Sequence, residues 1–405
     1  MKPLSEIEIP YGRYWSTPFV KWQGSLQHLH AMRFAAKVAK ERFAAWELDP
    51  RSLDSAVLGM TNAQYQSFYG APWPLYEMGA THTPGHMLTQ VCASSVRTLF
   101  AAVSDVMLGQ GSTVLALTAD RCSNGAHLYY PAPRGAGGNG QSEDQVLYNM
   151  VHDAIGGHSM LTTAENAASK YGIATEQQHE VSLMRLEQYR AALADDQAFQ
   201  RRYMTLPLEV PKPNFKSVDT VLSGDEGVYP STAEGLAKLR PTLPDGTVTS
   251  GAQTHPADGN AGMIVATSEV AQRLSARPDI RIRVKGFGQH RTDLAMMPLA
   301  PVGASKAALG NAGVAIGDIK VIKSHNPFVV NDIIFAKETG TDLAKMNNYG
   351  SSLIWGHPQG PTGMRAMIEM VEELVISGGG LGLFQGCAAG DSAMAVVIEV
   401  DERPA

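Results

Sequence analysis

The chain has 405 residues, of which 44% are hydrophobic and 18% charged, and its formal net charge is −6. A single hydrophobic core rarely grows to this length, so two or three packed lobes are expected. The negative charge argues against a nucleic-acid partner, although a local basic pocket for a phosphorylated cofactor stays open. The N-terminal segment MKPLSEIEIP lacks the apolar stretch of a signal peptide, and no apolar run approaches the ~18 residues of a membrane span. We therefore expect a cytoplasmic protein without a membrane partner.

The first predicted elements alternate between helix and strand. Residues 29–45 have helical periodicity, residues 55–60 form a short apolar strand, and residues 96–108 form a second helix that runs into a Gly-Gln-Gly turn. A buried strand follows at residues 114–117. This alternation predicts a layered α/β architecture.

An internal repeat connects the two ends of the chain. Residues 94–117 (SSVRTLFAAVSDVMLGQGSTVLAL) match residues 362–385 (TGMRAMIEMVEELVISGGGLGLFQ) in register, so that Arg97 pairs with Arg365 at an offset of 268 residues. The same offset pairs Ala119 with Cys387. The flanking segments LDSAVLGM and GDIKVIKS resemble each other, as do ADGNAGMIVA and AGDSAMAVVI. Two similar α/β halves are therefore expected.

A long polar segment rich in helix-favouring residues, at about residues 120–250, interrupts the first half. Such an insertion in a compact fold is usually functional. The predicted organisation is a first half in residues 1–119 and 251–274, an inserted loop domain in residues 120–250, and a second half in residues 275–405.

The three cysteines, Cys92, Cys122 and Cys387, are odd in number and lack CxxC spacing, so neither a disulfide framework nor a zinc knuckle is expected. Cys92 precedes a helix whose predicted cap is Ser94, and the free N–H groups at a helix N-terminus stabilise a thiolate. A buried core cysteine is the alternative. The HTPGH segment at residues 82–86 has the histidine spacing of a helical metal site, but its Pro-Gly pair argues against a helix, so no metal site is predicted.

His357 and Cys387 are the other candidates for chemistry. His357 lies between Gly356 and Pro358, and a histidine on a rigid loop is suited to proton transfer, although a lone histidine is more often structural. Cys387 ends an apolar strand and enters the turn CAAGDS, whose N–H groups can point at a ligand. Reactive residues at the ends of duplicated elements are typical of α/β ligand sites.

The segments VCASS, GHPQGPTGMR and GCAAGDSAM resemble the three signature blocks of the thiolase family, in that order. TAENAASKYGIATEQQ and LAKLRPTLPDGTVTSGA resemble the family's loop domain and its return to the core. The resemblance implies a thiolase fold of two βαβαβαββ halves in a layered α-β-α-β-α core, with a loop domain that holds coenzyme A. It also implies an acyltransferase that cleaves a 3-oxoacyl-CoA, with coenzyme A as cosubstrate and no permanently bound cofactor.

The same resemblance assigns roles to individual residues. Cys92 would carry the acyl group as a thioester, His357 would act as its base, and Cys387 would move the proton at the α-carbon. Negative charge on two thioester oxygens requires preorganised donors. One set would be the backbone N–H groups of Cys92 and Ala389, and the other would be His357 with His325.

Two departures from the family pattern affect these roles. The block HNPF at residues 325–328 replaces the common NEAF, and its first histidine resembles the sterol-carrier-protein type, which has HDCF. Pro327 takes the place of the cysteine of that block, so Cys387 keeps the acid/base role and His325 supplies an oxyanion donor. Ala389 replaces a family glycine, so that a positive φ there would be strained.

Four residues are expected to contact coenzyme A: His158, Leu239, Ser250 and Thr254. The details stay open, because Thr254 replaces a family serine and His158 is one residue out of register with the family histidine.

Five aromatic residues crowd residues 65–76, namely Tyr65, Phe68, Tyr69, Trp73 and Tyr76. They indicate a subunit interface or core, or alternatively an aromatic-lined acyl pocket. With the segments GSSLIWGHPQGPTG and HNPF, the second interpretation resembles the family branch that cleaves benzoylsuccinyl-CoA in aromatic degradation together with a small zinc-ribbon/OB-fold partner.

Alternatives to that branch remain. A generic acetyl-CoA C-acyltransferase or acetyltransferase fits the same motifs. A decarboxylating ketoacyl synthase would need a Cys, His, His set, against which Cys387 argues, and a catalytically silent scaffold subunit would be expected to lose Cys92. A homodimer or a dimer of dimers is expected.

Overall fold

The structure is a computed structural model, and it describes residues 1–403. The N-terminal part of the core contains β1 (Ile7–Glu8), β2 (Tyr14–Ser16), β3 (Val20–Lys21), α1 (Ala31–Ala45), β4 (Ser55–Gly59), α2 (Pro72–Met78), β5 (Gly85–Leu88), α3 (Ser94–Met107), β6 (Thr113–Arg121), β11 (Ala257–Thr267) and α9 (Ser268–Leu274). The C-terminal part contains β12 (Ile280–Arg291), α10 (Ala300–Ala312), β13 (Ile319–His325), α11 (Val329–Thr339), α12 (Ser352–Trp355), α13 (Gly360–Ile376), β14 (Gly380–Ala388) and β15 (Ser392–Glu402). The helices and strands predicted before residue 120 all form.

The duplication predicted from the sequence is visible in the strand pairing. The main sheet has the order β13-β14-β15-β12-β1-β11-β6-β4-β5. β4 pairs in parallel with β6, and β6 pairs antiparallel with β11; β13, β14 and β15 repeat this arrangement. Helix α3 precedes β6 as α13 precedes β14. The two halves meet where β1 pairs with β12.

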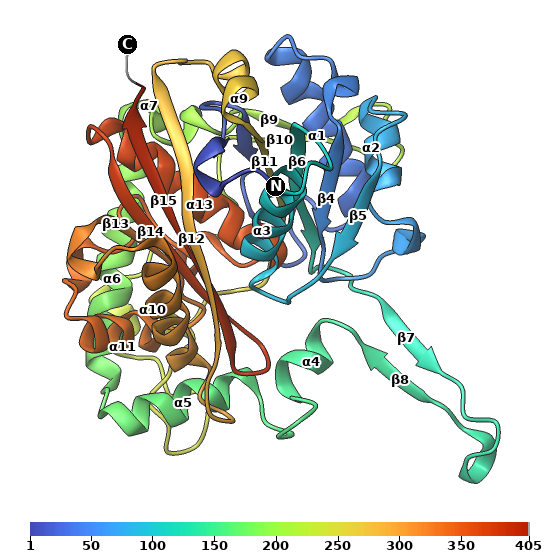
Figure 1. Ribbon diagram of the computed structural model, residues 1–405. Helices are drawn as coiled ribbons and strands as arrows, with labels where there is room; N and C mark the ends of the chain where they lie inside the picture. The colour runs from blue at the N-terminus through green and yellow to red at the C-terminus, as the bar shows by residue number, and fades with distance from the viewer. Residues whose placement is uncertain (404–405) are drawn as a thin grey trace.

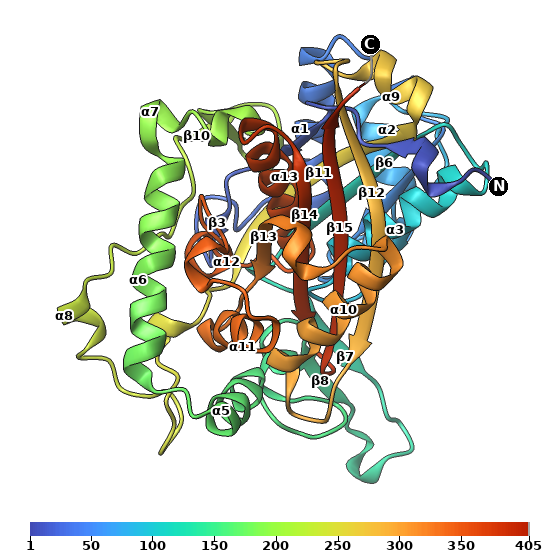
Figure 2. The ribbon, with the colours of Figure 1, turned by 60° about the vertical axis from the view of Figure 1, so that its left-hand side comes forward.

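The layers of the fold follow from which helices pack on each face of the strands. Successive side chains of a strand point to opposite faces. In β6, Val114 and Ala116 pack in one hydrophobic cluster with α3 and α13, whereas Leu115 and Leu117 pack on the other face with α1 and α2. In β14, Leu383 packs with α10 and α11. Helices α3 and α13 therefore form a middle layer between the two halves, and the predicted α-β-α-β-α order is confirmed (Figure 1 and Figure 2).

The segment between β6 and β11 adds elements outside these layers. They are β7 (His127–Tyr130), β8 (Gln141–Asp144), α4 (Leu147–Val151), α5 (Met160–Tyr171), α6 (Thr175–Ala192), α7 (Ala194–Gln197), β9 (Leu208–Pro211), β10 (Val218–Leu222) and α8 (Ala233–Leu236). The β7–β8 hairpin extends away from the body of the molecule, and α4 leads back to it (Figure 1). The domain limits at residues 119, 250 and 274 stay a prediction. Within residues 1–403, no helix combines the length and apolar character needed to cross a membrane.

Candidate active site

Cys92 lies in a strained turn that leads into α3. Val91 before it has a φ of +48°, which is rare for a β-branched residue. The hydroxyl of Ser94 accepts the N–H of Gln90 at 2.8 Å and donates to the carbonyl of Val91 at 2.7 Å. Ala93, rather than the predicted Ser94, occupies the N-cap of α3. Ser94 therefore fixes the turn that presents the Cys92 thiol instead of capping the helix.

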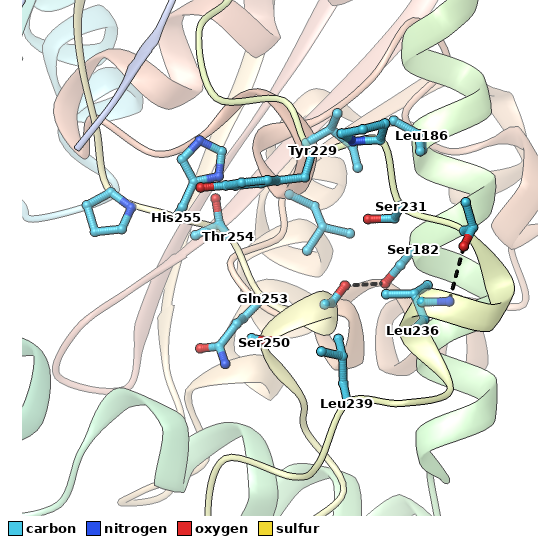
Figure 3. Close-up of a pocket in the computed structure, with 17 residues that line it drawn as sticks. Ser182, Leu186, Tyr229, Ser231, Leu236, Leu239, Ser250, Gln253, Thr254 and His255 are labelled. Atoms are coloured by element: carbon cyan, nitrogen blue, oxygen red, sulfur yellow. Dashed lines mark hydrogen bonds between the residues drawn. The ribbon is translucent and has the colours of Figure 1, made fainter. Parts of the chain in front are cut away.

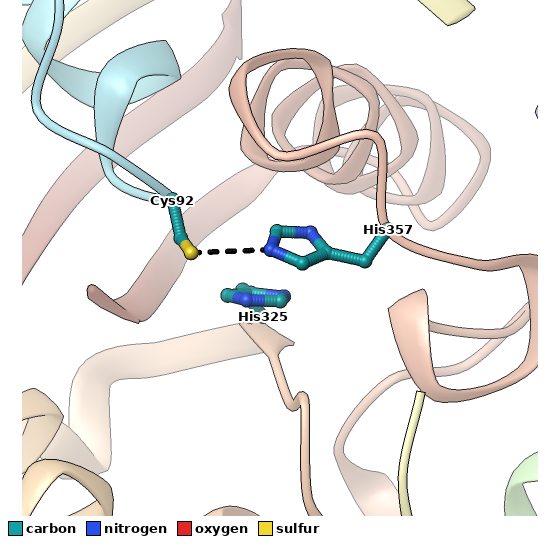
Figure 4. A group of neighbouring side chains, drawn as sticks. All are labelled: Cys92, His325 and His357. Carbon is teal, nitrogen blue, oxygen red and sulfur yellow. Dashed lines mark hydrogen bonds between the residues drawn. The ribbon is translucent and has the colours of Figure 1, made fainter. Parts of the chain in front are cut away.

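His357 faces that thiol. Its Nε2 lies 3.1 Å from Sγ of Cys92 (Figure 4). Its Nδ1 lies 2.6 Å from the hydroxyl oxygen of Thr362. A ring proton on Nδ1, donated to Thr362, leaves Nε2 free to accept the thiol proton. The backbone N–H of His357 donates to the carbonyl of His255 at 2.9 Å. Gly356 has a φ of +93°, and a Cβ there would lie 2.8 Å from Nε2 of His255, so this position requires glycine.

His325 stacks on the ring of His357, with ring centroids 4.0 Å apart and an angle of 27° between the planes (Figure 4). Its Nδ1 lies 2.9 Å from Oγ of Ser352, and its buried Nε2 has no hydrogen-bond partner among the described residues. Cys92, His325 and His357 are close enough to suggest a metal site. However, stacked rings direct their lone pairs along separate planes, so one ion cannot lie in both planes at bonding distance. The contact of His357 with Cys92 and the free Nε2 of His325 instead suit proton transfer and oxyanion binding.

Burial determines the resting charges of Cys92 and His357. Burial raises the pKa of Cys92 to about 12, although the backbone N–H groups of Ala389 and of Cys92 itself oppose the rise. Burial also lowers the pKa of His357 to about 3, and the neighbouring His255 contributes to the shift. The expectation of a thiolate stabilised by the helix N-terminus does not hold, because desolvation outweighs the N–H groups. The pair rests as a neutral thiol beside a neutral imidazole.

Cys387 lies near the end of β14, close to Cys92. Its Sγ accepts a hydrogen bond from Nδ2 of Asn331 at 3.3 Å, and burial raises the pKa of the thiol. Ala389 does not have the positive φ that would strain an alanine, because the left-handed residues of this turn are Gly390 and Asp391, with φ of +80° and +55°. The N–H of Ala389 therefore reaches Sγ of Cys92 without backbone strain.

A buried carboxylate holds the loop after His357. Asp120 accepts the backbone N–H groups of Thr61 at 2.9 Å, Asn62 at 3.0 Å and Gly360 at 2.9 Å, and burial raises its pKa to about 7. Sequence reasoning missed this residue. It also missed the side chains that hold the catalytic candidates, which are Asn331, Ser352 and Thr362. Only Thr362 gave a signal, since it lies in the same motif as His357.

Two cavities meet at these residues. The first, which we call the catalytic cavity, has a volume of about 510 Å³, and Cys92, His357, Cys387 and Ala389 line it. The second, the entrance cavity, has a volume of about 650 Å³ and lies beside α6 and α8 (Figure 3). Gln253, Thr254 and Pro256 line both.

The four residues predicted to contact coenzyme A separate into two groups. Thr254 lies where the cavities meet, and Leu239 and Ser250 line the entrance cavity. His158 lines neither of them.

The aromatic residues of segment 65–76 do not line the acyl pocket, and most of them lie outside the core. Tyr65, Phe68, Tyr69 and Tyr76 are between 67% and 93% exposed, so they are not core residues. Trp73 is half-buried, and none of the five lines either cavity. The interpretation as an aromatic acyl pocket is therefore wrong. Trp73 packs against a hydrophobic cluster of the core, and for the four exposed rings only the subunit interface remains.

The fold and the paired cysteine and histidine define an enzyme of the thiolase class. The family model for the N-terminal thiolase domain matches residues 14–269, and that for the C-terminal thiolase domain matches residues 279–400. The chain belongs to the thiolase family. It is an acyltransferase, and coenzyme A is its cosubstrate.

Known proteins agree with this assignment. The chain is 30% identical to an acetyl-CoA acetyltransferase of Chromobacterium violaceum, over 93% of this chain and 95% of that protein. An acetyl-CoA acetyltransferase of Escherichia coli is 28% identical, over 95% of this chain and 96% of that protein. The crystal structure of human mitochondrial 3-ketoacyl-CoA thiolase superposes with a TM-score of 0.87 at 25% identity, covering 97% of this chain and 98% of that one.

Proposed function

We propose that this thiolase cleaves a 3-oxoacyl-CoA with coenzyme A through an acyl group carried on Cys92. The observation that carries the proposal is the 3.1 Å contact between Sγ of Cys92 and Nε2 of His357 at the wall of the catalytic cavity. Because both groups rest neutral, the thiol proton moves to His357 as the sulfur attacks.

The chemistry then runs in two halves. The Cys92 sulfur bonds to the 3-oxo carbon, and the bond between the second and third carbons breaks. The resulting acetyl-CoA carbanion takes a proton from the Cys387 thiol, and the Cys387 thiolate then takes the proton held by His357. In the second half, coenzyme A gives its thiol proton to His357, its sulfur takes the acyl group, and Cys92 recovers the proton. Condensation is the same sequence in reverse.

Developing negative charge needs donors in both halves. The N–H groups of Cys92 and Ala389 are positioned for the oxygen of the acyl group on Cys92, since both already approach its sulfur. The unpaired Nε2 of His325, together with His357, is positioned for the thioester oxygen of the carbanion.

We place coenzyme A in the entrance cavity. Its pantetheine arm would pass Leu239 and Ser250 and reach Cys92 beside Thr254. The ring of Tyr229, which meets His255 edge to face at 5.9 Å, would cover the arm from the open side (Figure 3). His158 would contact coenzyme A only after a movement of its loop.

The aromatic substrate suggested by the sequence remains a second candidate. Cleavage of benzoylsuccinyl-CoA would leave a benzoyl group on Cys92, and the catalytic cavity favours it by its volume of about 510 Å³ and its apolar walls. A small zinc-ribbon/OB-fold subunit would belong to that activity. For either substrate we propose a cytoplasmic enzyme that self-associates as a homodimer or a dimer of dimers.

Two other activities on this scaffold fit less well. A decarboxylating synthase could use the cluster of Cys92, His325 and His357, but it would leave Cys387 without a role. A silent scaffold subunit would not need a cysteine held within hydrogen-bond distance of a histidine.

Intact-protein mass spectrometry after mixing with acetoacetyl-CoA tests the proposal. The wild type should gain the mass of one acetyl group, and Cys92→Ser should not. Cys122→Ser is the matched control, because Cys122 is a second thiol at the cavity wall, and it should keep the adduct. Absence of the adduct from the wild type, or its persistence in Cys92→Ser, would refute Cys92 as the nucleophile.

A further inference from the structure

The catalytic cavity extends beyond the reacting groups into an apolar chamber. Its far walls come from α4, the start of α5, residues 242–243, the turn that begins at Met297 and the loop before α11. The apolar side chains there are Val146, Leu147, Met150, Val151, Met160, Leu161, Leu243, Met297, Pro327 and Phe328. Five separate segments thus converge on one chamber behind Cys92.

The chamber lacks a partner for a charged acyl group. Among residues 1–403, no lysine, arginine, aspartate or glutamate lines it. Its two polar side chains away from the catalytic end are hydroxyls: Oγ of Ser159 accepts the N–H of Thr162, and Oγ1 of Thr242 accepts Nε2 of Gln253. A carboxylate placed there would meet no cation and at most these hydroxyl donors, so most of its lost hydration would not be replaced.

The catalytic cavity, of which the chamber is a part, is also much larger than an acetyl group. Its volume of about 510 Å³ equals the share of roughly 17 water molecules in the liquid, whereas an acetyl group has three non-hydrogen atoms. Each methylene moved from water to an apolar wall is expected to raise kcat/KM roughly fourfold until the space is filled.

We propose that the acyl group carried by Cys92 is an uncharged apolar chain or ring of medium size, and that α4 is the wall that sets its length. This inference rests on the thiolase activity proposed above. Met150 is the residue of α4 that we assign to this limit, since it is half-buried and lines the chamber while its neighbour Asn149 is exposed. An acetyl group would leave most of the chamber unfilled, and an acyl group with a carboxylate would find no cation to pair with it.

Thiolysis rates with four 3-oxoacyl-CoA substrates test the inference. The substrates are acetoacetyl-CoA, 3-oxodecanoyl-CoA, 3-oxo-3-phenylpropionyl-CoA and 3-oxoadipyl-CoA, whose acyl part carries a carboxylate. The kcat/KM values of the second and third should exceed that of acetoacetyl-CoA at least tenfold, and 3-oxoadipyl-CoA should be the poorest of the longer substrates. Equal or better rates with acetoacetyl-CoA or 3-oxoadipyl-CoA would overturn the inference.

Two variants of Met150 test whether α4 limits the length of the acyl group. Met150→Trp should lower the ratio of 3-oxodecanoyl-CoA to acetoacetyl-CoA at least tenfold, and Met150→Lys should raise the ratio of 3-oxoadipyl-CoA to 3-oxodecanoyl-CoA. Ile155→Trp is the matched control, because Ile155 is 63% exposed and lines neither cavity, and it should keep the native ratios. Unchanged ratios in both Met150 variants would show that α4 is not the wall. If no substrate is cleaved and Cys92 is never acylated, the thiolase activity itself fails.

Discussion

At the scale of single residues, the neutral state of Cys92 determines how its reactivity depends on pH. Burial raises the pKa of the thiol to about 12, so the thiolate fraction should grow about tenfold per pH unit well beyond neutrality. We expect alkylation of Cys92 by iodoacetamide to accelerate about tenfold from pH 7 to 8 and again from pH 8 to 9, measured by mass spectrometry of the Cys92 peptide. A rate that is level across this range would instead indicate a preformed thiolate and imidazolium pair.

The hydroxyl proton of Ser352 determines which ring nitrogen of His325 carries a proton. Its Oγ accepts the N–H of Asn326 at 3.1 Å and faces two groups that can take its proton, Oδ1 of Asn326 at 3.1 Å and Nδ1 of His325 at 2.9 Å. A hydroxyl has one proton, and Oδ1 of Asn326 already accepts the N–H of Leu353 at 3.2 Å. If Ser352 donates to Nδ1, the ring proton of His325 lies on Nε2, where an oxyanion donor must carry it.

This proton arrangement predicts the effect of removing the hydroxyl. Ser352→Ala should lower kcat about 10- to 100-fold with little change in KM, and Ser352→Thr should retain most of the activity. Nitrogen-15 NMR of His325 should show the proton on Nε2 in the native protein and a mixture of tautomers in Ser352→Ala. A lower kcat with an unchanged tautomer would mean that Ser352 only supports the fold.

At the scale of elements, helix α13 anchors the loop that carries His357. Arg365 of α13 is buried, donates to both carboxylate oxygens of Asp225 at 2.6 and 2.9 Å, and lies over the ring of Trp355 at 4.4 Å. Trp355 ends α12 two residues before His357. The inserted segment, through Asp225, therefore holds the catalytic loop against the middle layer. Separating Arg365 from Asp225 would leave an unpaired charge in the protein interior, which is costly. Helix α13, the inserted segment and the loop that carries His357 are therefore held together as one unit.

This anchor also shows which features the sequence could predict. The internal repeat correctly paired α3 with α13, and the helix and strand patterns placed Cys92, His357 and Cys387 at element ends, because both depend on residues close together in the sequence. The repeat could not distinguish the environments of the paired arginines. Arg97 donates to Gln289 at the surface, whereas Arg365 is buried against Asp225. The contact between Asn331 and Cys387 was equally hidden, since it depends on how α11 packs against β14.

At the scale of the whole molecule, one edge of the main sheet remains open. Within the described chain, β5 ends the sheet and pairs only with β4. Its Met87 is 41% exposed, and Gly70 lies against it, so the aromatic segment that contains Phe68 and Tyr69 borders this edge. An open strand beside exposed apolar side chains is a template for pairing with another chain. A second copy related by a twofold axis would pair its β5 with this one.

If β5 forms the dimer contact, negative charges introduced beside β5 should weaken the dimer. The wild type should sediment as a dimer or a dimer of dimers, and Phe68→Glu combined with Tyr69→Glu should reduce the mass by breaking the β5 contact, because four carboxylates would meet across each twofold axis. Ile376→Glu is the matched control, since Ile376 is 50% exposed at the end of α13, and it should keep the native mass. Circular dichroism establishes that both variants are folded. A monomeric wild type would exclude this interface, whereas a double variant of native mass would shift the contact to another surface, such as the β7–β8 hairpin that extends from the body.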